Sequence, residues 1–119
     1  MAEIASVFLY LLTQTRLYHW QTPVYIKHKA AGNYYEAMDG LVDKFIETYQ
    51  GRYGRIMYQP FQANFQNISD EQFLVELAKF VDFLATKMPA AVQRDTDLMN
   101  IRDEMLGTTN HAIYLLNLQ

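Results

Sequence analysis

The residue types best suited to chemistry in this sequence gather between positions 28 and 47, where one histidine is followed by four carboxylates. If this segment is helical, successive residues advance about 100° around the axis, and all five side chains then fall on one side. Like charges four residues apart destabilise a helix by roughly 0.2–0.5 kcal/mol per pair unless a cation compensates them. The five residues are His28, Glu36, Asp39, Asp43 and Glu47.

This one-sided group has two interpretations. Carboxylates and imidazoles that project from facing helices bind iron or manganese in helical bundles, and His19 would add a second ring nitrogen from the end of the preceding helix. Alternatively, the carboxylates form a solvated flank that pairs with Lys29, Lys44 or arginines of other helices, and His19 is a helix-dipole partner or a packed ring. The sequence alone leaves both interpretations open.

A second set of polar residues, Asp97, Glu104 and His111, recurs every seven positions and therefore shares one helix face. Any three residues at that spacing line up, so we interpret them as salt-bridged or exposed to solvent. The sequence contains no Gly-rich phosphate loop, nucleophile elbow or dinucleotide fingerprint. It also contains no cysteine, which excludes thiolate zinc sites and iron–sulfur clusters. A bound metal would therefore need His, Asp or Glu ligands.

The elements that position these residues are helices, because apolar residues recur at intervals of three and four along most of the chain. Thr22 before Pro23 predicts an N-cap, Ser69 with Gln72 predicts a capping box, and Pro89 predicts a helix end. The pattern indicates an all-α fold, an antiparallel four-helix bundle that forms one domain over residues 1–119. The expected helices cover residues 2–18, 23–50, 69–88 and a fourth segment that begins near Asp95 or Thr96 and continues almost to the C terminus.

A short extra helix is expected in the loop between the second and third helices. Pro60 is suited to the first position of a helical turn, and such a turn would put Phe61, Phe65 and Ile68 on one packed side. The aromatic-rich residues 53–65 and the amphipathic second helix also offer more apolar surface than a core of this size needs. We therefore expect the chain to associate with itself, as a homodimer or a larger homo-oligomer.

Composition and charge exclude several partners. Half of the 119 residues are apolar, and the net charge of −3 comes without any basic cluster, so we expect no nucleic-acid partner. The apolar run at residues 4–12 lacks the flanks of a signal peptide and is shorter than the ~20 residues of a membrane span. We expect no membrane partner and a cytoplasmic location.

Residues 16–52 resemble the Dps-like branch of the ferritin superfamily, in which the first helix ends in a His-Trp pair and the second carries a His, an Asp and a Glu. The matching residues here are His19 with Trp20, His28, Asp43 and Glu47. The resemblance implies a ferritin-like bundle that binds one or two iron ions at a dimer interface, with the later Asp and Glu supplied by the second subunit. It implies oxidation of ferrous iron by peroxide or oxygen, a ferroxidase activity, with manganese or zinc as alternative metals.

Within this resemblance, the family's additional acid, four residues after the second His, falls at Gly32, so Asp39 or Glu36 would have to take its place. The stretch of residues 19–55 also looks similar to small uncharacterised proteins of large marine phages, which would place the chain in a bacterial or phage-infected cytosol. The alternative hypothesis is a non-catalytic interaction or assembly protein that keeps the bundle without a metal. That hypothesis predicts that the row of carboxylates from Glu36 to Glu47, the acidic stripe, is in contact with water and holds no metal ion.

Overall fold

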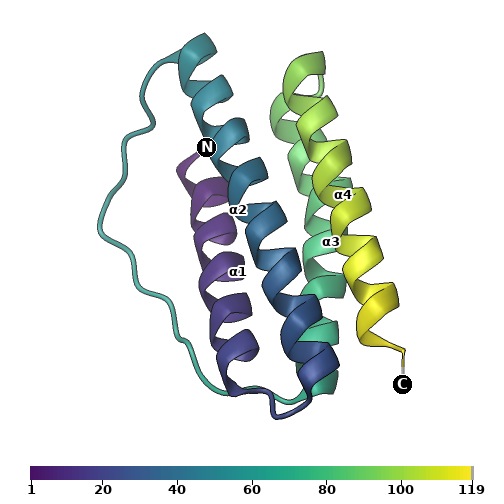
Figure 1. The fold of residues 1–119 in the computed structure, drawn as a ribbon. Helices are drawn as coiled ribbons and strands as arrows, with labels where there is room; N and C mark the ends of the chain where they lie inside the picture. The colour runs from purple at the N-terminus through teal and green to yellow at the C-terminus, as the bar shows by residue number, and fades with distance from the viewer. Residues whose placement is uncertain (119) are drawn as a thin grey trace.

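The computed structural model describes residues 1–118, which form four α-helices and no β-strand (Figure 1). The helices are α1 (Ala2–Gln21), α2 (Tyr25–Tyr53), α3 (Asp70–Val92) and α4 (Thr96–Leu116). This arrangement confirms the predicted all-α four-helix bundle. None of the helices within residues 1–118 combines the length and the hydropathy that a bilayer crossing requires.

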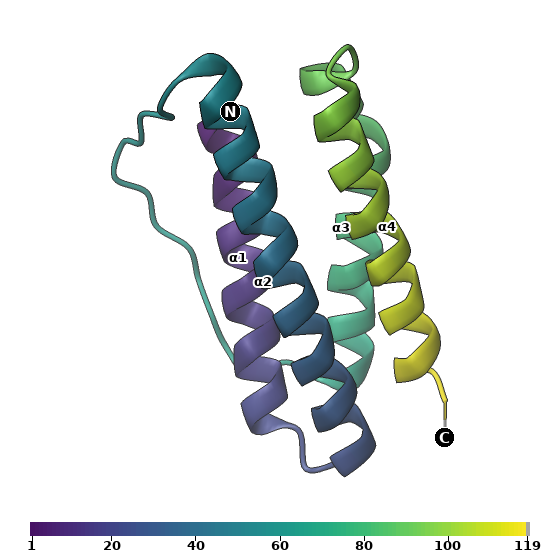
Figure 2. The same ribbon diagram turned by 45° about the horizontal axis from the view of Figure 1, so that its top comes forward.

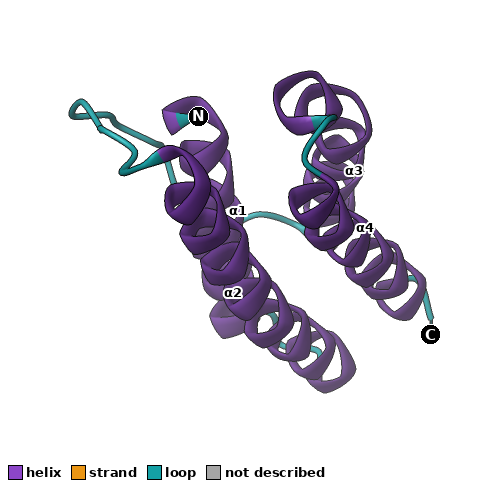
Figure 3. Ribbon diagram, turned by 90° about the horizontal axis from the view of Figure 1, so that it is seen from above, coloured by secondary structure: helices purple, strands orange, loops and turns teal. Residues whose placement is uncertain are grey.

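The helices form two hairpins, α1–α2 and α3–α4, joined by a crossover of residues 54–69 that returns along the bundle (Figure 1 and Figure 2). Neighbouring helices are therefore antiparallel. The two hairpins pack together mainly through α2 and α4, whereas the backbones of α1 and α3 are the least closely packed of the four neighbouring pairs (Figure 3). Large aromatic side chains fill the space between α1 and α3. Phe8 lies 6.3 Å from Phe80, and Tyr18 stacks on Phe73 at 4.1 Å between ring centroids.

The connection between α1 and α2 differs from the prediction. α1 continues to Gln21, and α2 begins at Tyr25 rather than at Pro23. Thr22 does not cap the helix as expected; its hydroxyl accepts a 3.3 Å hydrogen bond from the backbone N–H of Val24, which is the N-cap residue. The longer α1 leaves a tight connection of residues 22–24, which places the last turn of α1 beside the first turn of α2.

The start of α3 agrees with the prediction and its end does not. Ser69 and Gln72 form the capping box, in which each side chain accepts a 3.1 Å hydrogen bond from the other residue's backbone N–H. The predicted end at Pro89 is wrong, because the helix continues to Val92. Proline removes one helical hydrogen bond. Burial of Met88 and Val92, at 0% and 2% exposure, offsets this loss on either side of the ring.

The short helix predicted within residues 54–69 is absent, and the crossover is irregular throughout. Its path explains this. The crossover has 16 residues and returns along a molecule 43 Å long, a distance that a helix of this length, at about 1.5 Å per residue, would not span, so most of the segment is more extended than a helix. The aromatic residues of this segment are consequently only partly packed. Phe65 stacks on Tyr10 at 5.7 Å between centroids, while Phe61 remains 51% exposed.

Candidate functional site

His19 and His28 form a pair that joins the last turn of α1 to the first turn of α2. Their rings are stacked, with centroids 3.9 Å apart and planes inclined by 16°. The Nδ1–H of His19 donates to the backbone carbonyl of His28, and the Nδ1–H of His28 donates to the carbonyl of His19, both at 2.6 Å. The carbonyl of His19 lies in the last turn of α1, where carbonyls lack helical partners. Each histidine therefore fixes the orientation of the other.

These reciprocal hydrogen bonds determine which ring nitrogen is free. A carbonyl oxygen only accepts, so the proton of each neutral ring resides on Nδ1, and the lone pair of Nε2 is available. The sequence had placed His19 at the end of the first helix, as a candidate second nitrogen ligand or as a packed ring. It did not show that both rings would share one place and one tautomer.

Gly32 gives the ring of His19 its space. A Cβ on residue 32 would stand 2.7 Å from Cε1 and 3.0 Å from Nδ1 of His19, closer than van der Waals contact permits. Sequence reasoning had treated Gly32 only as the position where a family acid is missing. In the structure, the absence of a side chain at Gly32 leaves room for the imidazole of His19. The one available signal was a glycine inside a long helix, four residues after His28.

The stacked rings line an open pocket of about 450 Å³ at the α1–α2 corner. Arg16 lies on its wall with the guanidinium 4.1 Å from the ring centroid of Tyr35, a cation–π contact. Lys29 and Glu36 also line the pocket. Within residues 1–118 neither Arg16 nor Lys29 forms an ion pair, so the pocket holds more uncompensated positive than negative charge.

The four predicted carboxylates do not gather around the histidines of the same chain. Glu36 borders the pocket, but Asp43 and Glu47 lie about 22 and 28 Å further along α2, as follows from its rise per residue. All four acids, including Asp39, are exposed. Over the part of the chain that the structure describes, they form no ion pair, and no three His, Asp or Glu side chains come together in metal-binding geometry.

The second polar set follows the interpretation made from its spacing. Asp97 pairs with Arg52 at 3.6 Å, and Glu104 and His111 are exposed. Arg52 also pairs with Asp95 at 3.2 Å, and the hydroxyl of Tyr53 donates to the other oxygen of Asp95 at 2.6 Å. This group ties the end of α2 to the α3–α4 turn, at the opposite end of the bundle from the histidines.

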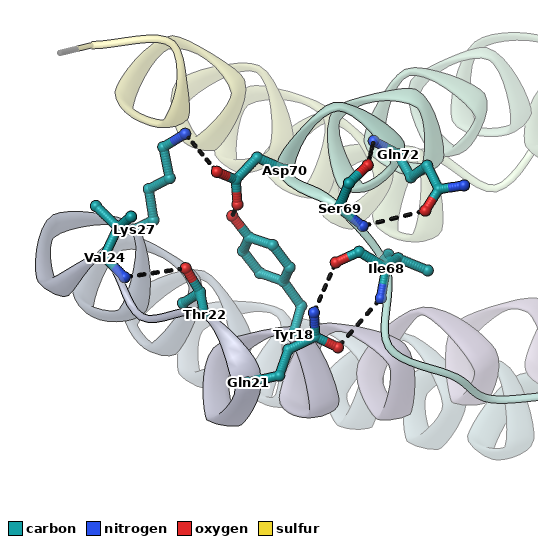
Figure 4. A network of polar contacts seen from close by, with 9 residues as sticks. All are labelled: Tyr18, Gln21, Thr22, Val24, Lys27, Ile68, Ser69, Asp70 and Gln72. Atoms are coloured by element: carbon teal, nitrogen blue, oxygen red, sulfur yellow. Dashed lines mark hydrogen bonds and ion pairs between the residues drawn. The ribbon is translucent and has the colours of Figure 1, made fainter.

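A similar group, drawn in Figure 4, involves Tyr18 and Lys27, the residues that precede the two histidines in the sequence. The hydroxyl of Tyr18 donates to Oδ1 of Asp70 at 2.5 Å, and the ammonium of Lys27 donates to Oδ2 at 2.9 Å. The bond from Tyr18 and then the contact with Lys27 hold the pKa of Asp70 below its ordinary value. Burial and then the carboxylate raise the pKa of Tyr18 well above that of a free tyrosine. One carboxylate thus joins α1, α2 and α3.

The end of the crossover is held at the same corner. The side-chain amide of Gln21 donates to the carbonyl of Ile68 at 2.6 Å and accepts from its N–H at 3.1 Å. The capping box at Ser69 then starts α3 directly afterwards, which places Asp70 above the α1–α2 connection (Figure 4). The sequence had indicated the capping box only.

The fold and the corner site define an all-α protein of the four-helix bundle class with one long crossover. Residues 19–116 match the model of DUF5856, a family of unknown function, and the chain therefore belongs to this family. The matched region opens at His19, so it contains both histidines of the pair. Comparison with curated proteins gave no match, and comparison with solved structures gave none either.

Proposed function

We propose that the chain binds divalent transition-metal ions, with iron as the natural candidate, through Nε2 of His19 and His28. The observation that supports this proposal is the pair of Nδ1–carbonyl hydrogen bonds. Histidines that bind metals almost always donate their other ring N–H to a carbonyl or carboxylate, which sets the tautomer and the ring orientation. Imidazole nitrogens combined with carboxylate oxygens suit iron, and also manganese or zinc.

The residues fit such an ion in ligand type but supply too few ligands within one chain. A metal binds close to the plane of an imidazole ring, and the two rings are nearly parallel. This geometry favours one ion on each ring over a single ion shared by both. Each ion then needs oxygen ligands, for which Glu36 is the one carboxylate of residues 1–118 that lines the pocket.

A second copy of the chain would supply the remaining carboxylates. If two α2 helices pair antiparallel about a two-fold axis near residues 37 and 38, position 28 of one copy faces position 47 of the other, and position 32 faces position 43. The acids Asp43 and Glu47 of each copy then approach the histidines of the other. The charges are complementary, because Arg16 and Lys29 at the pocket and Asp43 and Glu47 in the distal half of α2 form no ion pair among the residues that the structure describes.

The activity we propose for this site is the oxidation of ferrous iron by oxygen or peroxide, as the resemblance to Dps-like proteins implies. The topology supports the comparison, since ferritin-like bundles also contain one long crossover connection. Glu36, which borders the pocket, is the acid that would stand in for the family's additional ligand. Asp39, the other acid considered for this role, lies about 16 Å from His28 along α2 and faces position 36 of the other copy in this register.

A second candidate function is protein interaction without metal. The observation that favours it is the exposure of apolar side chains around the same corner, where Trp20, Tyr25 and Ile26 are 65%, 71% and 60% exposed. Exposed apolar residues clustered at one place mark association surfaces. In this case the acidic stripe would remain hydrated and metal ions would have no effect.

The test is thermal unfolding of protein purified without a metal-affinity tag, with and without Fe²⁺ (under anaerobic conditions), Mn²⁺ or Zn²⁺. At a hundredfold excess over Kd, binding stabilises the native state by about 2.7 kcal/mol, which is on the order of 10 °C in Tm for a domain of this size. His28→Ala should abolish the shift, and His111→Ala, at an exposed position on α4, should preserve it. If none of the three metals changes the Tm of the wild type, the interaction function replaces the metal function.

A further inference from the structure

Two contacts of different kinds connect the same two helix ends at adjacent positions. His19 and His28 bond to each other directly. One residue earlier on each helix, Tyr18 and Lys27 bond to the two oxygens of Asp70. The two contacts therefore connect the end of α1 to the start of α2 through different sides of these helices, and only the second contact involves α3.

We infer that Asp70 is a positioning residue for the histidine pair: its carboxylate holds residues 18 and 27 in register and thereby keeps both neighbouring imidazoles in the Nδ1–H tautomer. This inference rests on the proposed function for its biological meaning, since the tautomer matters only if Nε2 binds a ligand. The tautomers of the two imidazole rings, however, can be measured without metal.

The geometry makes the carboxylate difficult to replace. Asp70 uses one oxygen for each partner, so both oxygens must accept. In Asp70→Asn the amide oxygen can still accept from the ammonium of Lys27, but the NH₂ group then faces Tyr18, whose hydroxyl must change from donor to acceptor. Both contacts lose the carboxylate charge that strengthens them, although the size of the side chain is unchanged.

The contacts of Asp70 with Tyr18 and Lys27 also connect α3 to α1 and α2, because Asp70 belongs to α3. Asp70 is the first residue of α3, where the helix dipole favours a negative charge. The capping box of Ser69 and Gln72 fixes the helix start, and Gln21 fixes Ile68 immediately before it. The position of the α3–α4 hairpin therefore affects the α1–α2 connection through the contacts of this carboxylate.

The test is the ¹⁵N spectrum of the histidine rings, recorded without metal at about pH 8, where unperturbed histidines are neutral. The chain has three histidines, and exposed His111 is an internal reference. In the wild type, His19 and His28 should show a protonated Nδ1 and a free Nε2. In Asp70→Asn both should change toward a mixture of tautomers, while His111 stays unchanged. Lys27→Gln, which leaves the bond between Tyr18 and Asp70, should produce a smaller change in the same direction.

The matched control is Asp95→Asn. It removes the same kind of carboxylate, held by Tyr53 and Arg52, from the other end of the bundle. It should lower the Tm and leave the ring nitrogens of His19 and His28 unchanged. The inference is overturned if Asp70→Asn leaves the two rings as in the wild type, or if Asp95→Asn changes them equally.

The same variants separate this inference from the metal function. If the wild type binds metal, Asp70→Asn should raise the Kd about tenfold, the size expected for loss of a residue that supports metal ligands. If the wild type binds no metal but the tautomers change only in Asp70→Asn and Lys27→Gln, the positioning role stands and the metal function fails. If metal binding and tautomers are both unaffected by Asp70→Asn, the positioning role fails and the metal function stands.

Discussion

Gly32 lies against the imidazole of His19, so close that a methyl group on residue 32 would stand 2.7 Å from the ring. The two residues belong to different helices, and the missing side chain of one is the space that the other occupies. Removal of this space is the most direct way to disturb the histidine pair without touching a histidine.

Gly32→Ala should therefore displace the ring of His19 and break its bond to the carbonyl of His28. The atom in conflict is at the end of a side chain, so the ring can move while the helices stay in place. Alanine is favoured over glycine within a helix by about 1 kcal/mol, which offsets the lost contacts. The expected result is a free energy of unfolding within about 1 kcal/mol of the wild type, combined with altered ¹⁵N shifts of His19 and no metal-dependent stabilisation.

Gly107→Ala is the control for this prediction, because Gly107 lies within α4 and a Cβ there meets no atom within 4 Å. It should gain up to about 1 kcal/mol and leave the histidines unchanged. Wild-type ring shifts in Gly32→Ala would show that His19 does not depend on the glycine.

The combined change Asp43→Asn with Glu47→Gln should leave the metal-free protein as stable as the wild type or slightly more stable. The two acids are exposed like charges four residues apart, whose repulsion the change relieves. It should also abolish the metal-dependent rise in Tm and any ferrous oxidation. Asp82→Asn with Glu104→Gln changes the net charge equally at exposed positions on α3 and α4 and should keep both. A full metal response in the first variant would remove Asp43 and Glu47 from the site.

Acid should weaken the fold through Asp70. Its pKa is lowered in the folded protein, so the stabilisation is present above the pKa of the unfolded chain, about 3.9, and is lost as the pH falls through the lower folded value. Urea unfolding at several pH values should show Asp70→Asn less stable than the wild type by about 1 kcal/mol near neutrality. This difference should shrink below about pH 4. A difference that is independent of pH would mean that the charge of Asp70 contributes nothing.

Self-association should respond to charge at the centre of the paired α2 helices. In the proposed dimer, position 36 faces position 39 of the second copy, so Glu36 and Asp39 are like charges in contact. Asp39→Lys should replace this repulsion by attraction at two symmetric places, worth about 1 kcal/mol, or about fivefold in the dimer Kd.

Light scattering and sedimentation in the presence of a chelator measure this effect, and Asp82→Lys on α3 is the control. A wild-type mass that remains at 13.9 kDa at micromolar concentrations would contradict the dimer and any site assembled between two copies. Weaker association of Asp39→Lys would contradict the antiparallel register of α2.

Sequence periodicity was sufficient to predict the four long helices, and local capping predicted where α3 starts. The capping box of Ser69 and Gln72 involves residues three apart, and a helix places such neighbours in contact whatever the rest of the chain does. The alignment of His28 with the acids of α2 is a property of one helix for the same reason. Within this local range the sequence by itself determined the bundle and the candidate residues.

Tertiary structure decided what lies between the helices. Pro89 remains inside α3 because the burial of Met88 and Val92 offsets the tendency of proline to end a helix. Residues 54–69 are not helical because they must return along the whole bundle. The space at Gly32 belongs to a ring on another helix, and Asp70 meets Tyr18 across 52 positions of sequence. Such contacts depend on the distance and rotation of packed helices, which the energies of many side chains set together, and no single stretch of sequence carries that information.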